Sequence, residues 1–190
     1  VLDNMGQSQS STGTHFQKAE VRRTFEDVQS LWTEEELFSR IERIKELTLN
    51  FSLDRMKFGK LLQLPANKED LVGIWFQEFS KDRATKVVDG LEFLSVVILL
   101  SQVEIVRKTV LLFFLFDLEG KNSIRKDEFT IFLKAVSTGL HRCVKGLPPP
   151  ISVAELSSLS SEYFSFLGKQ ALTQEDMLIW VTEAHASLNY

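Results

Sequence analysis

The segment Leu111–Val136 reads LLFFLFDLEGKNSIRKDEFTIFLKAV. An apolar stretch with helical spacing runs into Asp117, and a second one starts at Phe129. The twelve residues between them, Asp117–Glu128, form a polar loop with the apolar Ile124 at its eighth place. Two apolar helices joined by a twelve-residue loop that opens with Asp and closes with Glu are typical of a calcium-binding helix–loop–helix unit, the EF-hand.

Three weaker copies of this unit occur elsewhere in the chain. They become visible when the loops are aligned on their closing residue, because an apolar residue follows each closing residue and another lies four places before it. The closing residues are Lys57, Glu92, Glu128 and Asp176, and the residues four places earlier are Leu53, Val88, Ile124 and Leu172. EF-hands work in pairs, since the eighth loop residue forms a β-bridge with the partner loop and the flanking helices share one core.

We therefore predict an all-α fold with four EF-hand-like helix–loop–helix units, paired into two lobes, and short two-stranded β-bridges between paired loops. Residues 1–19 are polar and predict a flexible N-terminal arm. Residues 20–101 hold the first pair, whose first confident helix starts at Thr33 with a capping box to Glu36. Residues 102–190 hold the second pair, with a proline-rich linker over 141–152.

The third loop is the best candidate for a metal site. Its first, third and twelfth places carry Asp117, Glu119 and Glu128, and Ser123 offers a backbone carbonyl at the seventh. Asn122 stands where calcium loops have glycine, and it is the non-glycine residue best suited to that turn. Against calcium binding, the fifth and ninth places carry Lys121 and Arg125.

Two hypotheses follow for the third loop. It is either a weak calcium site, or a loop held shut without metal by Lys121 or Arg125 paired with Asp117 and Glu128. The other loops predict no ion, so calcium is expected at one site at most, and no other cofactor is indicated. The first loop, Glu46–Lys57, closes with a lysine. The second, Ser80–Glu92, has thirteen residues and three cations, and the fourth, Ser165–Asp176, lacks ligands.

Composition disfavours several classes of function. The formal net charge of −4 gives no support to nucleic-acid binding. The single cysteine, Cys143, excludes an internal disulfide, and the longest apolar run is too short to span a membrane. The three histidines are scattered, and no nucleophile–base pair or phosphate-binding glycine loop is present, so we expect no enzyme.

Aromatic residues of the first pair have two interpretations. They form either the core or an apolar groove that accepts a partner helix (Trp32, Trp75, Phe76, Phe79 and Phe93). The segment Met5–Ser10 matches a myristoylation signal that would acylate Gly6 if Met5 is the true start. Since one myristoyl chain binds membranes only marginally, we expect membrane association only if Gly6 is acylated, and then with the help of a partner.

The chain resembles the neuronal calcium sensor family, which includes recoverin, and more loosely calcineurin B. The resemblance rests on the Met5-Gly6 start with Ser10, the helix start Trp32–Leu37, the 35- and 36-residue steps between closing residues, the long last linker and Trp180-Val181. It implies two lobes of paired EF-hands that regulate partner proteins. In that family the second loop normally binds calcium, and here it does not fit.

These observations predict a calmodulin-like regulatory or adaptor subunit that binds a helix or tail of a partner protein, largely independently of calcium. The alternative is a calcium sensor with one working loop, 117–128, that exposes an apolar groove on binding and is recruited to membranes by myristoylation. The expected location is the cytoplasm, with the cytoskeleton, a cilium or a membrane surface as more specific alternatives.

Overall fold

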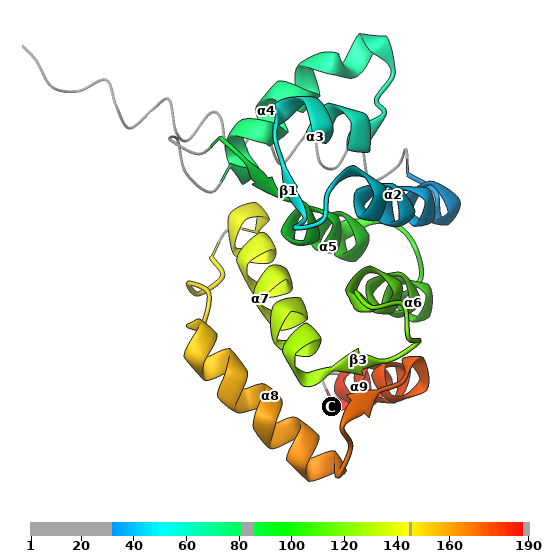
Figure 1. The fold of residues 1–190 in the computed structure, drawn as a ribbon, viewed down its shortest axis with the longest axis vertical. Coiled ribbons are helices and arrows are strands. Elements are labelled where there is room, and N and C mark those ends of the chain that lie inside the picture. The colour runs from blue at the N-terminus through cyan, green and yellow to red at the C-terminus, as the bar shows by residue number, and fades with distance from the viewer. Residues whose placement is uncertain (1–31, 81–85, 145, 188–190) are drawn as a thin grey trace, which may run out of the picture.

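The structure is a computed structural model that describes residues 32–80, 86–144 and 146–187 (Figure 1). The predicted arm over 1–19, including Gly6, lies outside these residues. Within them the chain is mostly helical, with two short antiparallel sheets, which confirms the coarse fold prediction.

A two-residue strand lies between two helices four times in the described residues. The first two units are α2 (Glu34–Leu47), β1 (Ser52–Leu53) and α3 (Arg55–Leu62), followed by α4 (Glu69–Phe79), β2 (Val88–Asp89) and α5 (Gly90–Leu100). A 3-10 turn, η1 (Ala66–Lys68), precedes α4. The last two units are α6 (Ile105–Phe116), β3 (Ile124–Arg125) and α7 (Lys126–Cys143), then α8 (Val153–Leu167), β4 (Ala171–Leu172) and α9 (Gln174–Ser187).

The two sheets join the loops in the predicted pairs. Leu53 in β1 lies opposite Val88 in β2, and Ile124 in β3 lies opposite Leu172 in β4. All four side chains are buried. Each bridge therefore places one apolar residue from each loop in the core and aligns the helices that follow.

Capping side chains fix where α2 and α5 begin. Thr33 caps α2 with the predicted capping box to Glu36. Asp89 accepts the N–H groups of Leu91 and Glu92, so α5 begins at Gly90, two residues before the closing residue Glu92.

The helix α7 continues to Cys143, so the linker begins three residues later than its predicted start at residue 141. Basic side chains in the last turn favour this extension because they complement the negative end of the helix dipole. One of them, Arg142, is also anchored outside the helix, since its Nη1 donates to the carbonyl of Glu78 at 3.1 Å.

The N-terminal half (32–80 and 86–101) and the C-terminal half (102–144 and 146–187) share one buried core. In Figure 1, α5 of the first half lies against α7 of the second. Gly139 allows this close approach, because a Cβ there would meet Val96 Cγ2 at 2.3 Å and the Glu92 carbonyl oxygen at 2.9 Å. Arg142 Nε lies 2.5 Å from Glu92 Oε1 at the same interface.

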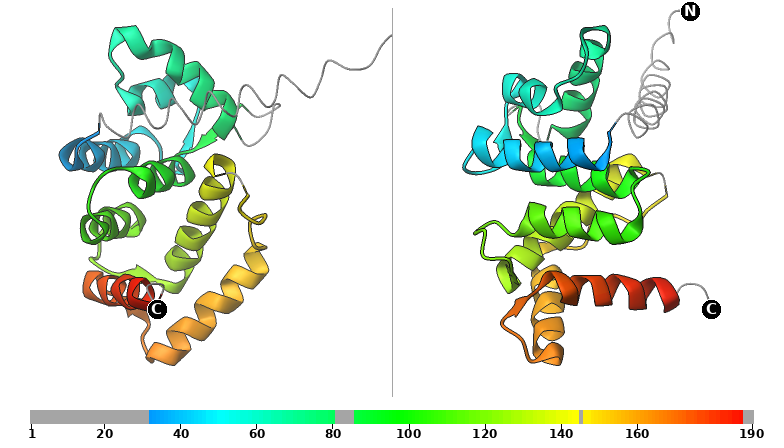
Figure 2. Two further views of the ribbon diagram at one scale, coloured as in Figure 1. Left: turned by 180° about the vertical axis from the view of Figure 1, so that it is seen from behind. Right: turned by 90° about the vertical axis from the view of Figure 1, so that its right-hand side faces the viewer.

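A second contact between the halves joins α2 to α6. Lys45 Nζ donates to the carbonyls of Phe114 at 2.9 Å and Asp117 at 3.1 Å, which lie at the carboxyl end of α6. A cation at this position also complements the helix dipole. Figure 2 shows α2, α6 and α9 side by side on one face of the molecule, and α8 packs on α7 on the other side.

Candidate functional site

The third loop has the backbone shape that its residue order predicts. Gly120 and Asn122 both adopt left-handed conformations, with φ of 66° and 54°. Asn122 thus makes the turn that glycine makes at the sixth place of a calcium loop, as expected from its tolerance of this region. Ser123 follows, half-buried, and leads into β3.

Asp117 and Glu128 lie inside the loop and hold its backbone. Each is only 3% exposed. The two carboxylate oxygens of Asp117 accept the N–H groups of Lys121 and Asn122, both at 2.9 Å. Those of Glu128 accept the N–H groups of Leu118 at 3.0 Å and Arg125 at 2.8 Å. The first and last loop residues therefore tie both ends of the loop to its middle.

Lys121 and Arg125, the cations at the fifth and ninth places, contact Glu119 at the third place. Lys121 Nζ lies 2.6 Å from Glu119 Oε2, and the guanidinium of Arg125 pairs with the other oxygen. The hydrogen bond from Lys121 lowers the pKa of Glu119, and the charge of Arg125 lowers it further. The prediction that Lys121 or Arg125 pairs with Asp117 and Glu128 is thus wrong about the partner. Backbone N–H groups already occupy those two carboxylates, so the cations turn to the exposed Glu119.

The loop carboxylates already contact groups of the loop itself. Calcium takes six to eight oxygen ligands, and here Asp117 and Glu128 accept loop N–H groups while Glu119 pairs with Lys121 and Arg125. Over the described ranges, no three or more His, Cys, Asp or Glu side chains lie close enough together to hold a metal. A calcium ion bound by Glu119 would have to displace Lys121 and Arg125 from that carboxylate.

The fourth loop uses a related internal contact. Lys169, at the fifth place like Lys121, lies 2.5 Å from the carboxylate of the closing residue Asp176. Asp176 also accepts the N–H and hydroxyl of Thr173, both at 2.9 Å. Burial raises the pKa of Asp176, but the hydrogen bonds from Lys169 and Thr173 together leave that pKa lowered.

The first two loops share a feature that residue types do not reveal. Phe51 and Lys86 have φ of 57° and 45°, and each lies six places before its closing residue, as Asn122 does before Glu128. Neither residue type favours this region. Only the spacing from the closing residue could have predicted these turns.

The predicted groove residues lie in the core. All five side chains are buried (Trp32, Trp75, Phe76, Phe79 and Phe93). Phe93 contacts the rings of Trp32, Trp75 and Phe79, and Phe76 joins this cluster through Phe58. The structure therefore brings these five residues together but does not present them as an open groove.

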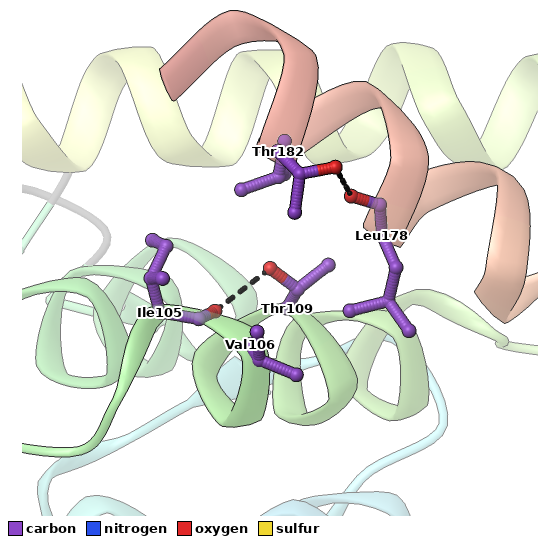
Figure 3. A pocket seen from close by; sticks show the side chains of 6 residues that line it. Ile105, Val106, Thr109, Leu178 and Thr182 are labelled. Carbon is purple, nitrogen blue, oxygen red and sulfur yellow. Dashed lines mark hydrogen bonds between the residues drawn. The ribbon is translucent and has the colours of Figure 1, made fainter. Parts of the chain in front are cut away.

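An apolar pocket that the sequence did not indicate lies between α6 and α9 (Figure 3). It measures about 80 Å³, and its lining comes from the first turns of α6 and the middle of α9 (Ile105, Val106, Thr109, Leu178, Val181 and Thr182). The signal for it was present in the first turn of α6, where two apolar residues, Ile105 and Val106, follow directly on Glu104.

Comparisons with known proteins identify no family for this chain. No family model matches the chain, and a search of curated proteins finds no match. None of the helices in the described ranges is long and apolar enough to cross a membrane.

Proposed function

We propose that this chain is an EF-hand-type regulatory or adaptor subunit that binds a helix or tail of a partner protein and keeps its loops folded without calcium. The observation that carries the proposal is the internal bonding of the third loop. Asp117 and Glu128 bind loop N–H groups, and Glu119 binds Lys121 and Arg125.

Support for the EF-hand assignment comes from three independent features. Helix, strand and helix follow one another four times in the described chain, and the strands pair at the positions that EF-hand loops use. A left-handed residue also recurs six places before the closing residue in three of the loops. In these loops the left-handed turn, the β-bridge and the start of the second helix therefore keep the same spacing from one another, although the residue types differ.

Calcium independence is supported by the charges that replace the ion. A calcium ion would neutralise the loop carboxylates, and in loops three and four a lysine at the fifth place supplies positive charge instead. Such exposed ion pairs contribute little stability individually. The buried hydrogen bonds of Asp117 and Glu128 contribute more, because charged acceptors form stronger bonds.

The calcium sensor remains the second candidate, favoured by one specific observation. Asn122 is left-handed while Asp117 and Glu128 both point into the loop, so the backbone already has the conformation of a metal-binding loop. Under this alternative, calcium would displace the N–H groups of the loop and draw Glu119 away from its cations.

The experiment that separates the two candidates is affinity capture with the full chain. The captured partner is digested on the immobilised protein, and the retained peptides are mapped with calcium present and with a chelator. We expect the same partner helix to be retained in both conditions and by a Glu128→Gln variant. Retention that requires calcium and is lost in Glu128→Gln, but not in the exposed control Asp127→Asn, would instead establish the sensor. A chain that retains no partner peptide in either condition would contradict the adaptor function.

Membrane recruitment forms a separate part of the proposal. Acylation of Gly6 would add a marginal membrane anchor, and a partner would provide the rest of the affinity. Intact mass of the chain made together with a myristoyl transferase tests this, with a Gly6→Ala variant as control. A mass without the acyl chain contradicts recruitment by this route and leaves the adaptor function standing.

A further inference from the structure

One face of the molecule combines an apolar ridge, a pocket and a row of carboxylates. It is formed by α2, α6 and α9, which lie side by side in Figure 2, and we call it the α2–α6–α9 face. The ridge consists of Val106, Val110 and Phe114, spaced four residues apart along α6. Val106 is 44% exposed, and the other two side chains are half-buried. The outer side of this helix is therefore apolar where a solvated helix would carry polar residues.

The pocket lies along one side of this ridge. Ile105 and Val106 border it from α6, and Leu178 and Val181 border it from α9. Its two hydroxyl groups are already bonded within their own helices: Thr109 donates to the Ile105 carbonyl at 2.9 Å, and Thr182 donates to the Leu178 carbonyl at 2.9 Å (Figure 3). The pocket thus presents methyl and methylene groups to an occupant.

The size of the pocket narrows the choice of occupant. Its volume of about 80 Å³ is roughly half that of the engineered core cavity of about 150 Å³ that binds benzene. The size therefore favours a branched aliphatic side chain over a larger aromatic one. A side chain that enters needs no hydrogen-bonding group.

Carboxylates line the opposite side of the ridge. Phe38 of α2 packs edge-to-face on Phe114, with ring centroids 5.1 Å apart. Around Phe38 lie Glu34, Glu35 and Glu42 of α2. Glu34 pairs with Arg107 of α6, whereas Glu35 and Glu42 have no ion pair with any described residue. Glu35 and Glu42 are exposed and give this edge its negative charge, whereas Lys45 of α2 is turned to the carbonyls of Phe114 and Asp117.

We propose that the α2–α6–α9 face binds an amphipathic helix of a partner protein, with an aliphatic residue in the pocket and lysines or arginines along the edge that faces Glu35 and Glu42. This inference rests on the proposed adaptor function and gives it a surface. The charge complementarity selects the occupant, since a basic helix is attracted by the carboxylates while an anionic membrane is repelled by them. Helix-in-groove recognition of this kind uses anchors at successive turns, which matches the four-residue spacing of the ridge.

The test uses fluorescence anisotropy with the full chain and a labelled synthetic peptide. The probe is an amphipathic helix of about four turns, with leucine and isoleucine on one face and lysine along one edge. A second peptide has glutamate in place of every lysine. The variants are Val106→Asp in the ridge and Glu42→Lys on the acidic edge. Their matched controls are Val153→Asp and Glu162→Lys, which are exposed positions on α8.

We expect Val106→Asp to weaken binding of the lysine peptide about tenfold or more, because it places a charge at a central apolar anchor. Glu42→Lys should weaken it about threefold at low salt and reduce its salt dependence. The two control variants should bind like the unmodified chain, and the glutamate peptide should bind more weakly than the lysine peptide.

Several outcomes would overturn the inference. They are no binding of the lysine peptide, equal binding of both peptides, and an unchanged affinity in Val106→Asp. Binding of phosphatidylserine vesicles that depends on Val106 would identify a membrane surface instead. A dimer in sedimentation that Val106→Asp dissociates would identify a second copy as the occupant. If Val106→Asp still retains the partner peptide in the capture experiment, the adaptor function stands and only this surface is wrong.

Discussion

The second and third loops close with the same residue type, yet the two glutamates serve different parts of the molecule. Glu128 turns into its own loop and accepts the N–H groups of Leu118 and Arg125. Glu92, equally buried, pairs with Arg142 of α7 in the other half of the chain. One glutamate therefore bonds inside its own loop, and the other pairs between the two halves of the chain.

The difference shows two ways in which the chain accommodates a buried closing carboxylate. A buried carboxylate is costly unless it is paired or hydrogen-bonded. Glu92 and Glu128 each find such partners within the chain, Arg142 for Glu92 and the N–H groups of Leu118 and Arg125 for Glu128. Both buried closing carboxylates are thus paired or hydrogen-bonded by groups of the chain itself.

The largest expected effect is that of removing the charge of Glu92. A Glu92→Gln substitution leaves the guanidinium of Arg142 largely buried without its counter-charge and should lower the free energy of unfolding by about 3 kcal/mol. Glu128→Gln keeps one acceptor oxygen for the loop and should cost about 1.5 kcal/mol. Chemical denaturation measures both values. Equal losses, or a larger loss for Glu128→Gln, would contradict the division of roles between the two residues.

The next effect concerns the left-handed residues of the same two loops. Lys86 is exposed with φ of 45°, so Lys86→Gly relieves backbone strain and should stabilise the chain by about 1 kcal/mol. Asn122→Gly should change stability by less than about 0.5 kcal/mol, because asparagine tolerates this region. Lys86→Ala is the control and should bring no gain. A destabilised Lys86→Gly variant would show that the side chain, and not the turn, matters at this place.

A smaller effect is expected at the fourth loop, where the closing residue is an aspartate. Because the folded state lowers the pKa of Asp176, its contribution to stability is present at neutral pH and is lost as the pH falls through the lowered pKa. Lys169→Met should therefore cost about 0.5 kcal/mol at neutral pH and almost nothing in acid. The measurement is urea denaturation of both proteins over a pH series. A difference that grows as the pH falls would contradict this ion pair.

The smallest effect on stability is expected from the exposed cations of the third loop. Substitution of both Lys121 and Arg125 by glutamine should raise the pKa of Glu119 toward its ordinary value, since the two groups that lower it are removed. Carbon-detected NMR titration of the Glu119 carboxyl group measures the change. An unchanged pKa of Glu119 would show that the two cations do not contact it in solution. Glu175, which lies in another loop unit, is the reference carboxyl group.

Much of the fold was predictable because apolar periodicity and loop spacing act over short distances. The pairs Leu53–Val88 and Ile124–Leu172 followed from counting four places back from each closing residue. The start of α2 followed from the local cap at Thr33 and its capping box to Glu36.

The details of the candidate site depend on longer-range or subtler competition and were less predictable. Sequence placed cations in the third loop but not their partner, because the backbone N–H groups of Lys121 and Asn122 reach Asp117 first. The pairing of Glu92 with Arg142 joins residues from different halves, and no local pattern indicates it. Burial of the five aromatic groove candidates likewise depends on how the helices pack.

Calcium titration by calorimetry of the full chain tests the central claim most directly. If the third loop holds itself closed through Asp117, Glu119 and Glu128, no binding heat appears up to millimolar calcium. A single-site heat that disappears in Glu128→Gln, and persists in the neighbouring Asp127→Asn, would contradict the metal-independent account and establish the loop as a working calcium site.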